Sequence, residues 1–189
     1  MFQEQVEEFR KKCKRYNVPG HAHELTFGCY QGMPLFENKV FCQYFAEAVN
    51  KAKEPYAFDV WAYVIMPEHI HLLLFPYRPS YSISQILRSI KQSVSRKAVN
   101  WLKENQPGLL NQMVVEQPRK TYRFWQDGGG YDRNIFTRET AVNSAQYIHM
   151  NPVRRKLVET VDLWHYSSFG QSKGRVGPIE VNYRYFFKR

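Results

Sequence analysis

Two β-rich runs of the sequence are separated by Pro67 and Glu68 alone, and this spacing constrains the fold more than any other feature. Residues 57–66 (AFDVWAYVIM) are rich in β-branched and aromatic side chains, and residues 69–75 (HIHLLLF) form a second apolar run. Parallel neighbours in a sheet need a long crossover connection, whereas antiparallel neighbours can be joined by a tight turn. The two runs are therefore expected to form an antiparallel pair.

The rest of the sequence alternates helical and strand-like patterns, which predicts an α+β fold with a central antiparallel sheet and helices packed on it. Helices are expected over residues 1–15, 37–53, 82–103 and 137–150, and extended segments over residues 23–30, 114–136 and 179–187. Thr137 suits the N-cap of the last helix, which is expected to end just before Pro152. Residues 1–189 contain no repeat or linker and are expected to form one domain, with a basic extension from about residue 170.

The chain has 27 Lys and Arg residues but only 17 Asp and Glu residues, which gives a formal charge of +10 at pH 7. This excess favours a polyanionic partner, because each neutralised phosphate releases condensed counterions. A basic protein that binds no nucleic acid is an equally good interpretation of charge alone. No run approaches the roughly 20 apolar residues of a membrane span, so a cytoplasmic protein with no membrane partner is expected.

His69 and His71 stand two residues apart in the second apolar run. Residues i and i+2 of a strand point to the same face, so the imidazoles would converge while Ile70 faces the core. Two imidazoles are a good start for a divalent metal site, in which the cation polarises a phosphoryl oxygen. The alternative is a pair of surface histidines on an edge strand. A second such pair, His21 and His23, is interpreted as structural.

Tyr147 and Asn151 stand four residues apart on the last predicted helix and therefore share a face. Tyrosine is a poor nucleophile near pH 7, but it can attack a phosphate that is held in line and polarised by a metal. The side-chain oxygen of Asn151 could complete the coordination of that metal. A tyrosine packed at the sheet edge, with an asparagine that caps the helix, explains these two residues equally well.

Basic residues cluster along the predicted helix over residues 82–103 and around the aromatic residues near position 122. Cations follow a phosphate backbone, and exposed aromatic rings can stack on unpaired bases. Phe124 and Trp125 are nevertheless interpreted as core residues. The candidate DNA-binding residues are Arg88, Lys91, Arg96, Arg119, Lys120 and Arg123.

Several segments together resemble a known protein family. Residues 64–73 (VIMPEHIHLL) are similar to the histidine–hydrophobic–histidine (HUH) motif of the single-tyrosine transposases, and residues 146–154 (QYIHMNPVR) are similar to their tyrosine helix. Residues 123–126 (RFWQ) and 164–168 (WHYSS) are similar to two further family segments. The resemblance extends over about residues 23–169. Within the family, the Tyr-Ile-x-x-Asn-Pro form of the helix is most similar to the REP-associated tyrosine transposases, which act on palindromic repeats in bacterial genomes.

The resemblance implies a ferredoxin-like fold, Mg²⁺ or Mn²⁺ as cofactor, and single-stranded DNA folded into hairpins as substrate. It implies that His69 and His71 are metal ligands, with Asn151 as the third ligand, and that Tyr147 is the nucleophile. It also implies that Lys91 contacts DNA. The chain is expected to act at the bacterial nucleoid as a monomer or a homodimer. The resemblance assigns no role to the glycine run over residues 128–130.

The combined hypothesis is a hairpin-specific DNA endonuclease and strand transferase that forms a covalent 5′-phosphotyrosine. Tyr147 attacks the scissile phosphate, which frees a 3′-hydroxyl that can later reverse the step. One rival is a DNA-binding regulator of the same fold that has lost catalysis, although the intact candidate site argues against it. The others are a metal-dependent nuclease that uses water and a basic RNA-binding module.

Overall fold

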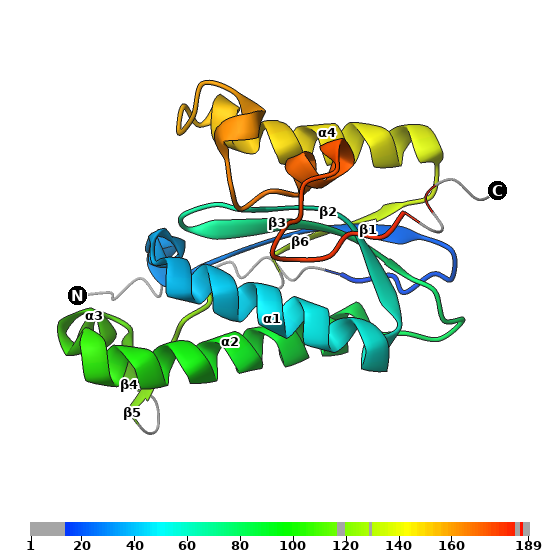
Figure 1. The fold of residues 1–189 in the computed structure, drawn as a ribbon. Helices are drawn as coiled ribbons and strands as arrows, with labels where there is room; N and C mark the ends of the chain where they lie inside the picture. Colours follow the sequence, from blue (N-terminus) through cyan, green and yellow to red (C-terminus); the bar gives the residue numbers. More distant parts are fainter. Residues whose placement is uncertain (1–13, 117–119, 129, 184–185, 187–189) are drawn as a thin grey trace, which may run out of the picture.

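The structure is a computed structural model that describes residues 14–116, 120–128, 130–183 and 186. Its elements form three layers (Figure 1). Helix α4 (Arg138–Arg154) covers one face of a central sheet, and helices α1 (Lys39–Tyr56) and α2 (Ile83–Asn105) cover the other. Within the described ranges, no helix is both long enough and apolar enough to cross a lipid bilayer.

Four antiparallel strands form the central sheet. Their order is β2 (Phe58–Ile65), β3 (His69–Pro76), β1 (Ala22–Gly28) and β6 (Tyr131–Ile135). The tight connection between β2 and β3 makes them an antiparallel pair, as predicted, and β2 is buried along its whole length. With α1 after β1 and α2 after β3, this strand order gives the predicted ferredoxin-like α+β fold.

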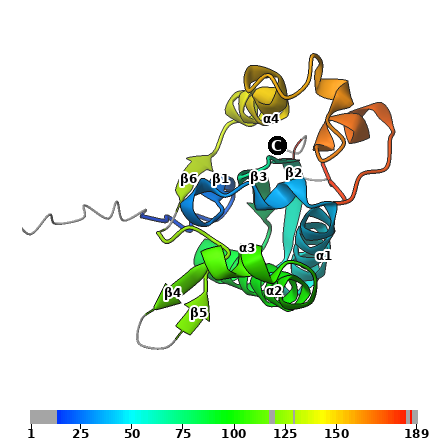
Figure 2. The ribbon, with the colours of Figure 1, turned by 90° about the vertical axis from the view of Figure 1, so that its left-hand side faces the viewer.

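The larger part of the core lies between the sheet and the pair α1 and α2, which run side by side (Figure 2). Each helix begins at a side chain that accepts a hydrogen bond from a backbone N–H of the first turn, Asn38 for α1 and Ser82 for α2. Apolar residues at helical spacing then face the sheet, and Phe45 of α1 and Ile90 of α2 are fully buried.

A smaller apolar cluster fixes α4 on the opposite face. Val64 and Leu73 of the sheet pack in this cluster with Ala141 and Ile148 of the helix. The helix begins after Thr137, whose hydroxyl accepts the N–H of Thr140, so this N-cap is confirmed. The position of α4 is therefore set by apolar burial on the same face of the sheet that carries the candidate histidines.

Helix α4 continues through Pro152 to Arg154, so the predicted end just before Pro152 is wrong. A proline lacks only its own N–H, and near the end of a helix this removes a single hydrogen bond. The N–H of Arg155 still bonds the carbonyl oxygen of Asn151 at 3.0 Å, so the helical bonding resumes after the proline. The extra turn brings two arginines to the end of the helix.

Both ends of the chain also differ from the predictions. Of the helix predicted over residues 1–15, residues 1–13 lie outside the described residues, and Lys14 and Arg15 are not helical. The strand predicted over residues 179–187 is absent from residues 179–183. The N–H of Asn182 bonds the carbonyl oxygen of Val60, where a bulge breaks the register of edge strand β2. The segment therefore docks on the edge without extending the sheet.

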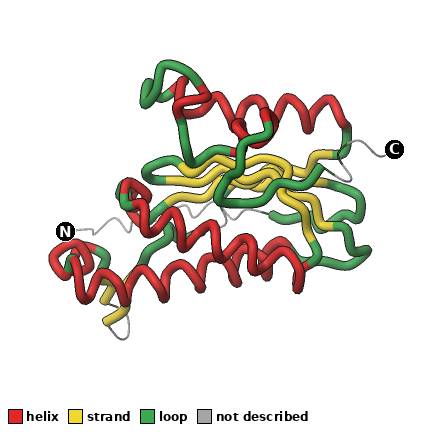
Figure 3. The backbone as a smooth tube through the Cα atoms, viewed as in Figure 1, coloured by secondary structure: helices red, strands yellow, loops and turns green. Residues whose placement is uncertain are grey.

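A small hairpin follows α2. Pro107 starts a short helix, α3 (Pro107–Gln112), which the sequence patterns did not predict. Strands β4 (Val114–Glu116) and β5 (Lys120–Tyr122) then pair as a two-stranded sheet, separate from the central one (Figure 3). Short 3-10 segments lie at Tyr30–Gly32, Leu35–Glu37, Val161–Leu163 and Ser168–Lys173.

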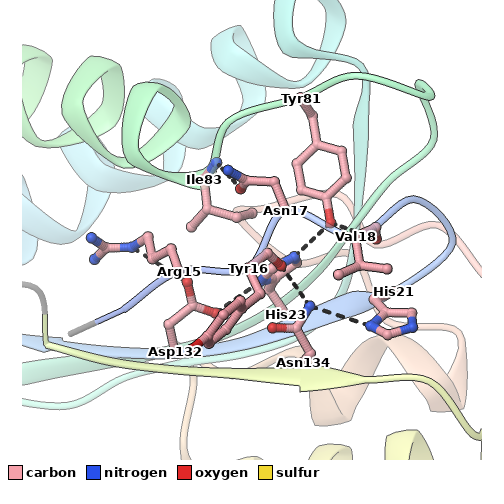
Figure 4. A network of polar contacts seen from close by, with 10 residues as sticks. All are labelled: Arg15, Tyr16, Asn17, Val18, His21, His23, Tyr81, Ile83, Asp132 and Asn134. Atoms are coloured by element: carbon pink, nitrogen blue, oxygen red, sulfur yellow. Dashed lines mark hydrogen bonds and ion pairs between the residues drawn. The ribbon is translucent and has the colours of Figure 1, made fainter.

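His23, near the start of β1, belongs to a buried polar network (Figure 4). Its Nδ1 lies 2.7 Å from Oδ1 of Asp132 on β6, and its Nε2 lies 2.8 Å from the hydroxyl of Tyr81. The Tyr81 hydroxyl donates to the carbonyl oxygen of Val18. The network ties the segment before β1 to β6 and to the start of α2, in agreement with the structural interpretation of His23.

Candidate active site

Strand β3 carries His69 and His71 on the sheet face that α4 covers. Ile70, between them, points the other way and is fully buried in the core under α1 and α2. Residue His71 lies opposite Thr26 of β1, and His69 lies opposite Gly28. Because β3 is flanked by β2 and β1, the histidines do not stand on an edge strand, and that alternative interpretation is excluded.

The two imidazole rings meet edge to face, with their Nε2 atoms 2.9 Å apart. The Nδ1 atom of His69 lies 3.0 Å from Oε1 of Glu68, and the Nδ1 atom of His71 lies 2.8 Å from the hydroxyl of Thr26. An ionised carboxylate only accepts hydrogen bonds, so Nδ1 of His69 donates to Glu68. In the neutral form of His69, Nε2 then keeps a lone pair that faces His71.

Burial lowers the pKa of both imidazoles. The pKa of His71 falls to about 4, because desolvation disfavours its charged form and a positive charge on His69 would repel it. The pKa of His69 also lies below its ordinary value, since desolvation outweighs the attraction of the Glu68 carboxylate. Both rings are therefore neutral near pH 7, the form in which an imidazole nitrogen binds a metal.

Helix α4 places Tyr147 beside the histidine pair. The Tyr147 and His71 rings are perpendicular, with their centroids 5.8 Å apart. The guanidinium carbon of Arg154, two turns further along α4, lies 4.9 Å from the centroid of the Tyr147 ring. Tyr147 is 42% exposed, so these neighbours cover only part of its side chain and leave the rest open to solvent.

Asn151 lies one turn after Tyr147 on α4 and is buried. Its side-chain nitrogen Nδ2 donates to the backbone carbonyl oxygen of Tyr147 at 2.9 Å. The side-chain oxygen Oδ1, the atom that could bind a metal, takes no part in that bond. In the part of the chain that the structure describes, no hydrogen bond joins Asn151 to either histidine. Its role as third ligand stays a prediction.

A pocket of about 550 Å³ lies between α4 and the strands β1 and β6, next to His71 and Tyr147. Because it includes both a candidate metal ligand and the candidate nucleophile, it is the space in which a substrate would meet them. Its lining residues are Glu24, Thr26, His71, Tyr131, Arg133, Thr140, Asn143, Ser144 and Tyr147.

Glu24 is a buried carboxylate in this pocket that the sequence analysis missed. The hydroxyl of Ser144 on α4 donates to its Oε2 at 2.8 Å, and the guanidinium of Arg133 lies 3.8 Å from the same oxygen. Glu24 stands two residues before Thr26 in β1, so the two share a face. The alternation rule that singled out His69 and His71 could have identified Glu24 in the strand predicted over residues 23–30.

A second carboxylate, Glu68, joins the start of β3 to the end of α4. Its Oε1 accepts from Nδ1 of His69 and also from the guanidinium of Arg155, at 2.8 Å. This contact orients His69 and holds the C-terminal end of the helix that carries Tyr147. No local sequence pattern indicates it, because the two residues are far apart in the chain.

The predicted DNA-binding residues of α2 lie away from this pocket. Arg88, Lys91 and Arg96 belong to the helix on the opposite face of the sheet. Arg88 and Arg96 are exposed, whereas Lys91 is half-buried. These three residues and the site formed by the histidines and Tyr147 therefore lie in two separate regions, on opposite faces of the sheet.

The predictions for the segment after α2 are confirmed only for its core residues. Arg119 lies outside the described residues, and so does the side chain of Lys120. Arg123 forms an ion pair with Asp127 at 2.6 Å. Phe124 and Trp125 are buried, and their interpretation as core residues is confirmed.

Comparison with known proteins identifies the family. Residues 24–151, which include His69, His71, Tyr147 and Asn151, match the family model described as "Transposase IS200 like". The chain belongs to the IS200-like transposase family. This membership places it in a class of enzymes, and it agrees with the resemblance noted in the HUH and tyrosine-helix segments.

Two curated relatives are named REP-associated tyrosine transposases. The Haemophilus influenzae protein is 29% identical over 133 residues, which are 66% of this chain and 66% of the relative. The Escherichia coli K12 protein is 26% identical over 133 residues, which are 70% of this chain and 67% of the relative. The IS200-like chain therefore spans about two thirds of the length of the relatives it matches.

A solved structure of a REP-associated tyrosine transposase bound to a REP hairpin has the same fold. Its TM-score is 0.67, and the match covers 90% of this chain and 91% of that chain at 20% identity. At this identity the likeness establishes the fold of the IS200-like chain, in agreement with the ferredoxin-like prediction.

Proposed function

We propose that this member of the IS200-like family is a hairpin-specific endonuclease and strand transferase of single-stranded DNA. The observation that carries the proposal is the contact between Tyr147 and His71, which joins a nucleophile on α4 to the imidazole pair on β3. REP-type palindromes are the proposed targets, because the curated relatives are named for their association with REP elements. The formal charge of +10 suits a nucleic acid.

The donor set at His69 and His71 fits a divalent cation, with Mg²⁺ or Mn²⁺ as the proposed cofactor. Both rings are neutral near pH 7. Glu68 contacts Nδ1 of His69 and Thr26 contacts Nδ1 of His71, and metal-binding histidines usually have such a hydrogen-bond partner on the nitrogen that does not bind the metal. Among the described residues, no group of three or more His, Cys, Asp and Glu side chains is placed to hold a metal ion. Oδ1 of Asn151 is therefore the proposed third protein ligand. A cation held here would polarise a phosphoryl oxygen of the substrate.

Tyr147 is the proposed nucleophile. Its phenolic oxygen forms a bond to the scissile phosphorus while the bond from phosphorus to the 3′ oxygen of the preceding nucleotide breaks. The phenol proton passes to solvent, and the departing 3′ oxygen takes up a proton to become a hydroxyl. The 5′ end stays on Tyr147 as a phosphodiester. A 3′-hydroxyl can reverse the step without ATP, because the phosphodiester bond is conserved.

A single chain supplies both halves of this proposed site. Strand β3 provides the histidines, α4 provides Tyr147, and the two rings meet within one molecule. The proposal therefore applies to a monomer and equally to each subunit of a homodimer. Action at the bacterial nucleoid follows from the DNA substrate and stays a prediction.

The test is a cleavage assay on hairpin oligonucleotides with unpaired flanks, drawn from palindromic repeats of the source genome. With a 3′ label and Mg²⁺ or Mn²⁺, a denaturing gel should show a protein–DNA adduct. Tyr147→Phe should abolish the adduct and leave binding nearly unchanged. Tyr131→Phe, which alters another tyrosine of the same pocket, is the matched control and should retain it.

Three results would contradict parts of the proposal. Free product ends without an adduct would indicate that water is the nucleophile. Hairpin binding without any cleavage would indicate a regulator that has lost catalysis. His69→Ala and His71→Ala should each remove metal-dependent cleavage, and full activity in EDTA would exclude the metal role.

A further inference from the structure

A second pocket, of about 540 Å³, lies on the other side of the sheet, between α2 and the segment that contains β5 and Trp125. None of its lining residues belongs to the candidate active site. One wall is the outer surface of α2, and the other is formed by Thr121, Tyr122 and Trp125. The pocket therefore needs an explanation of its own.

Lys91 gives this pocket a positive charge. Its ammonium lies 4.7 Å from the ring centroid of Phe27 and 5.6 Å from that of Trp125. No ion pair joins Lys91 to a carboxylate in the part of the chain that the structure describes. Burial and the nearby charge of Arg15 lower its pKa to about 8. A half-buried ammonium held only by aromatic faces is poorly compensated, so an anion in the pocket would be attracted.

Trp125 gives the pocket a rigid aromatic surface. Its indole Nε1 donates to the backbone carbonyl oxygen of Lys91 at 3.0 Å. The ring also packs against Phe27, Phe36 and Phe45, so its orientation is fixed before any ligand binds. Trp125 is only 7% exposed, so it forms a rigid floor of the pocket rather than an open stacking face. The half-buried Tyr122 lies in the same lining and provides the more open ring, on which a planar base can stack.

The rest of the lining offers hydrogen-bonding groups and a second cation. Gln92, Ser95 and Asn100 of α2 bring amide and hydroxyl groups, which can donate to and accept from the edge of a base. Arg96, which is exposed, brings a guanidinium that suits a phosphate. Aromatic rings, amides and cations together are what is expected in the lining of a pocket that binds a nucleotide.

The backbone links this pocket closely to the histidines on the other face. Trp125 pairs as a β-bridge with Cys29, the residue that directly follows β1. The N–H of Cys29 in turn bonds the carbonyl oxygen of Glu68, the neighbour of His69. The second pocket therefore lies near the same end of β1 and β3 as the candidate metal ligands.

We propose that this pocket binds one unpaired nucleotide of the DNA strand, with its base against Trp125 and Tyr122 and its phosphate at Lys91 and Arg96. The inference rests on the proposed function in taking single-stranded DNA as the ligand, and it adds a base-binding site outside the catalytic pocket. Such a site holds the strand outside the hairpin stem, and it gives the protein a means to fix which phosphate reaches Tyr147.

The test measures binding of a fluorescein-labelled, unpaired oligothymidylate by full-length protein in the Tyr147→Phe background, so that no adduct forms. Lys91→Met keeps the side-chain length but removes the ammonium, and it should weaken binding about fivefold or more. The slope of the logarithm of the binding constant against the logarithm of the salt concentration should become less steep by about 0.7. Lys97→Met is the matched control. Lys97 lies on the same helix but pairs with Glu47 of α1 and does not line the pocket.

The aromatic contact has its own test. Tyr122→Ala should weaken oligothymidylate binding about tenfold, whereas Tyr122→Phe, which keeps the ring, should bind within about twofold of the parent. Ultraviolet crosslinking of an oligonucleotide that contains 5-iodouracil should label Trp125 or Tyr122, identified by mass spectrometry. Equal effects of Lys91→Met and Lys97→Met, or crosslinks confined to other surfaces, would overturn the proposal.

These results can be separated from the fate of the catalytic proposal. If the pocket variants bind normally while the parent chain still forms an adduct at Tyr147, only the nucleotide pocket is wrong. If no adduct forms but the Lys91 and Tyr122 variants lose binding selectively, the pocket stands and the cleavage chemistry is wrong.

Discussion

The Nε2 atoms of His69 and His71 lie 2.9 Å apart, close enough that one nitrogen must donate a proton to the other. Because His69 donates from Nδ1 to Glu68, the bridging proton belongs to Nε2 of His71 when both rings are neutral. Nδ1 of His71 then accepts from the hydroxyl of Thr26. With both Nε2 atoms bound to a cation, His71 would carry its proton on Nδ1 and donate it to Thr26. The hydroxyl serves both states, since it can donate and accept.

Thr26→Val is therefore expected to weaken binding of Mn²⁺ by about 10- to 100-fold, because the metal-bound tautomer of His71 loses its acceptor. Isothermal titration of the DNA-free protein with Mn²⁺ measures this directly. Thr26→Ser keeps the hydroxyl and should bind within about threefold of the parent chain. Unchanged affinity in Thr26→Val would show that Thr26 does not support a metal-binding histidine.

Ser144→Ala is expected to lower the free energy of unfolding by about 1–2 kcal/mol, because it removes a donor from the buried carboxylate of Glu24. Urea denaturation monitored by circular dichroism provides the measurement. Gln146→Ala, at an exposed position on the same helix, is the control and should change stability by less than about 0.5 kcal/mol. Equal effects of the two substitutions would argue against a stabilising role for the Ser144–Glu24 bond.

His149 should make the protein less stable in mild acid. Burial lowers its pKa from 6.5 to about 4, and its Nε2 lies 2.7 Å from the hydroxyl of Ser168. Between these two pH values the unfolded chain binds a proton that the folded chain does not, so stability falls as the pH drops from about 6.5 to about 4. His149→Gln should remove roughly 2–3 kcal/mol of this loss. The check is the unfolding free energy at pH 7.0 and 4.5, and an identical pH dependence in parent and variant would contradict the prediction.

The two glycines at 128 and 130 should respond differently to alanine, although both have positive φ angles. A Cβ atom on Gly130 would stand 2.2 Å from the carbonyl oxygen of Thr26, whereas one on Gly128 would meet nothing within 4 Å. Gly128→Ala should cost about 1 kcal/mol from backbone strain, and Gly130→Ala about 3 kcal/mol or more. Thermal unfolding compares the two. A larger loss in Gly128→Ala would show that the close approach to β1 does not limit the residue at 130.

The sheet and the histidine pair were predictable because both depend on short-range patterns. A connection of three residues permits only the antiparallel pairing of β2 and β3, and the period of two along a strand puts His69 and His71 on one face. The N-cap at Thr137 is equally local. Such features can be predicted without knowing which residues pack against them.

The contacts that complete the site were not predictable in this way. The bond from Ser144 to Glu24 joins α4 to β1, and the bond from Arg155 to Glu68 joins the residue after α4 to the turn before β3. Both depend on how the helix lies across the sheet. The continuation of α4 through Pro152 is also a tertiary effect, because Pro152 is buried. The burial of Lys91 under Phe27 and Trp125 has the same origin.

Two carboxylates of the sheet hold α4 on either side of Tyr147, Glu24 through Ser144 and Glu68 through Arg155. The position of Tyr147 is thereby fixed. In the proposed reaction, a DNA end joined to Tyr147 would move only through the torsions of one side chain. The broken end would therefore stay within the span of a tyrosyl group from the imidazoles, which would favour resealing over its escape.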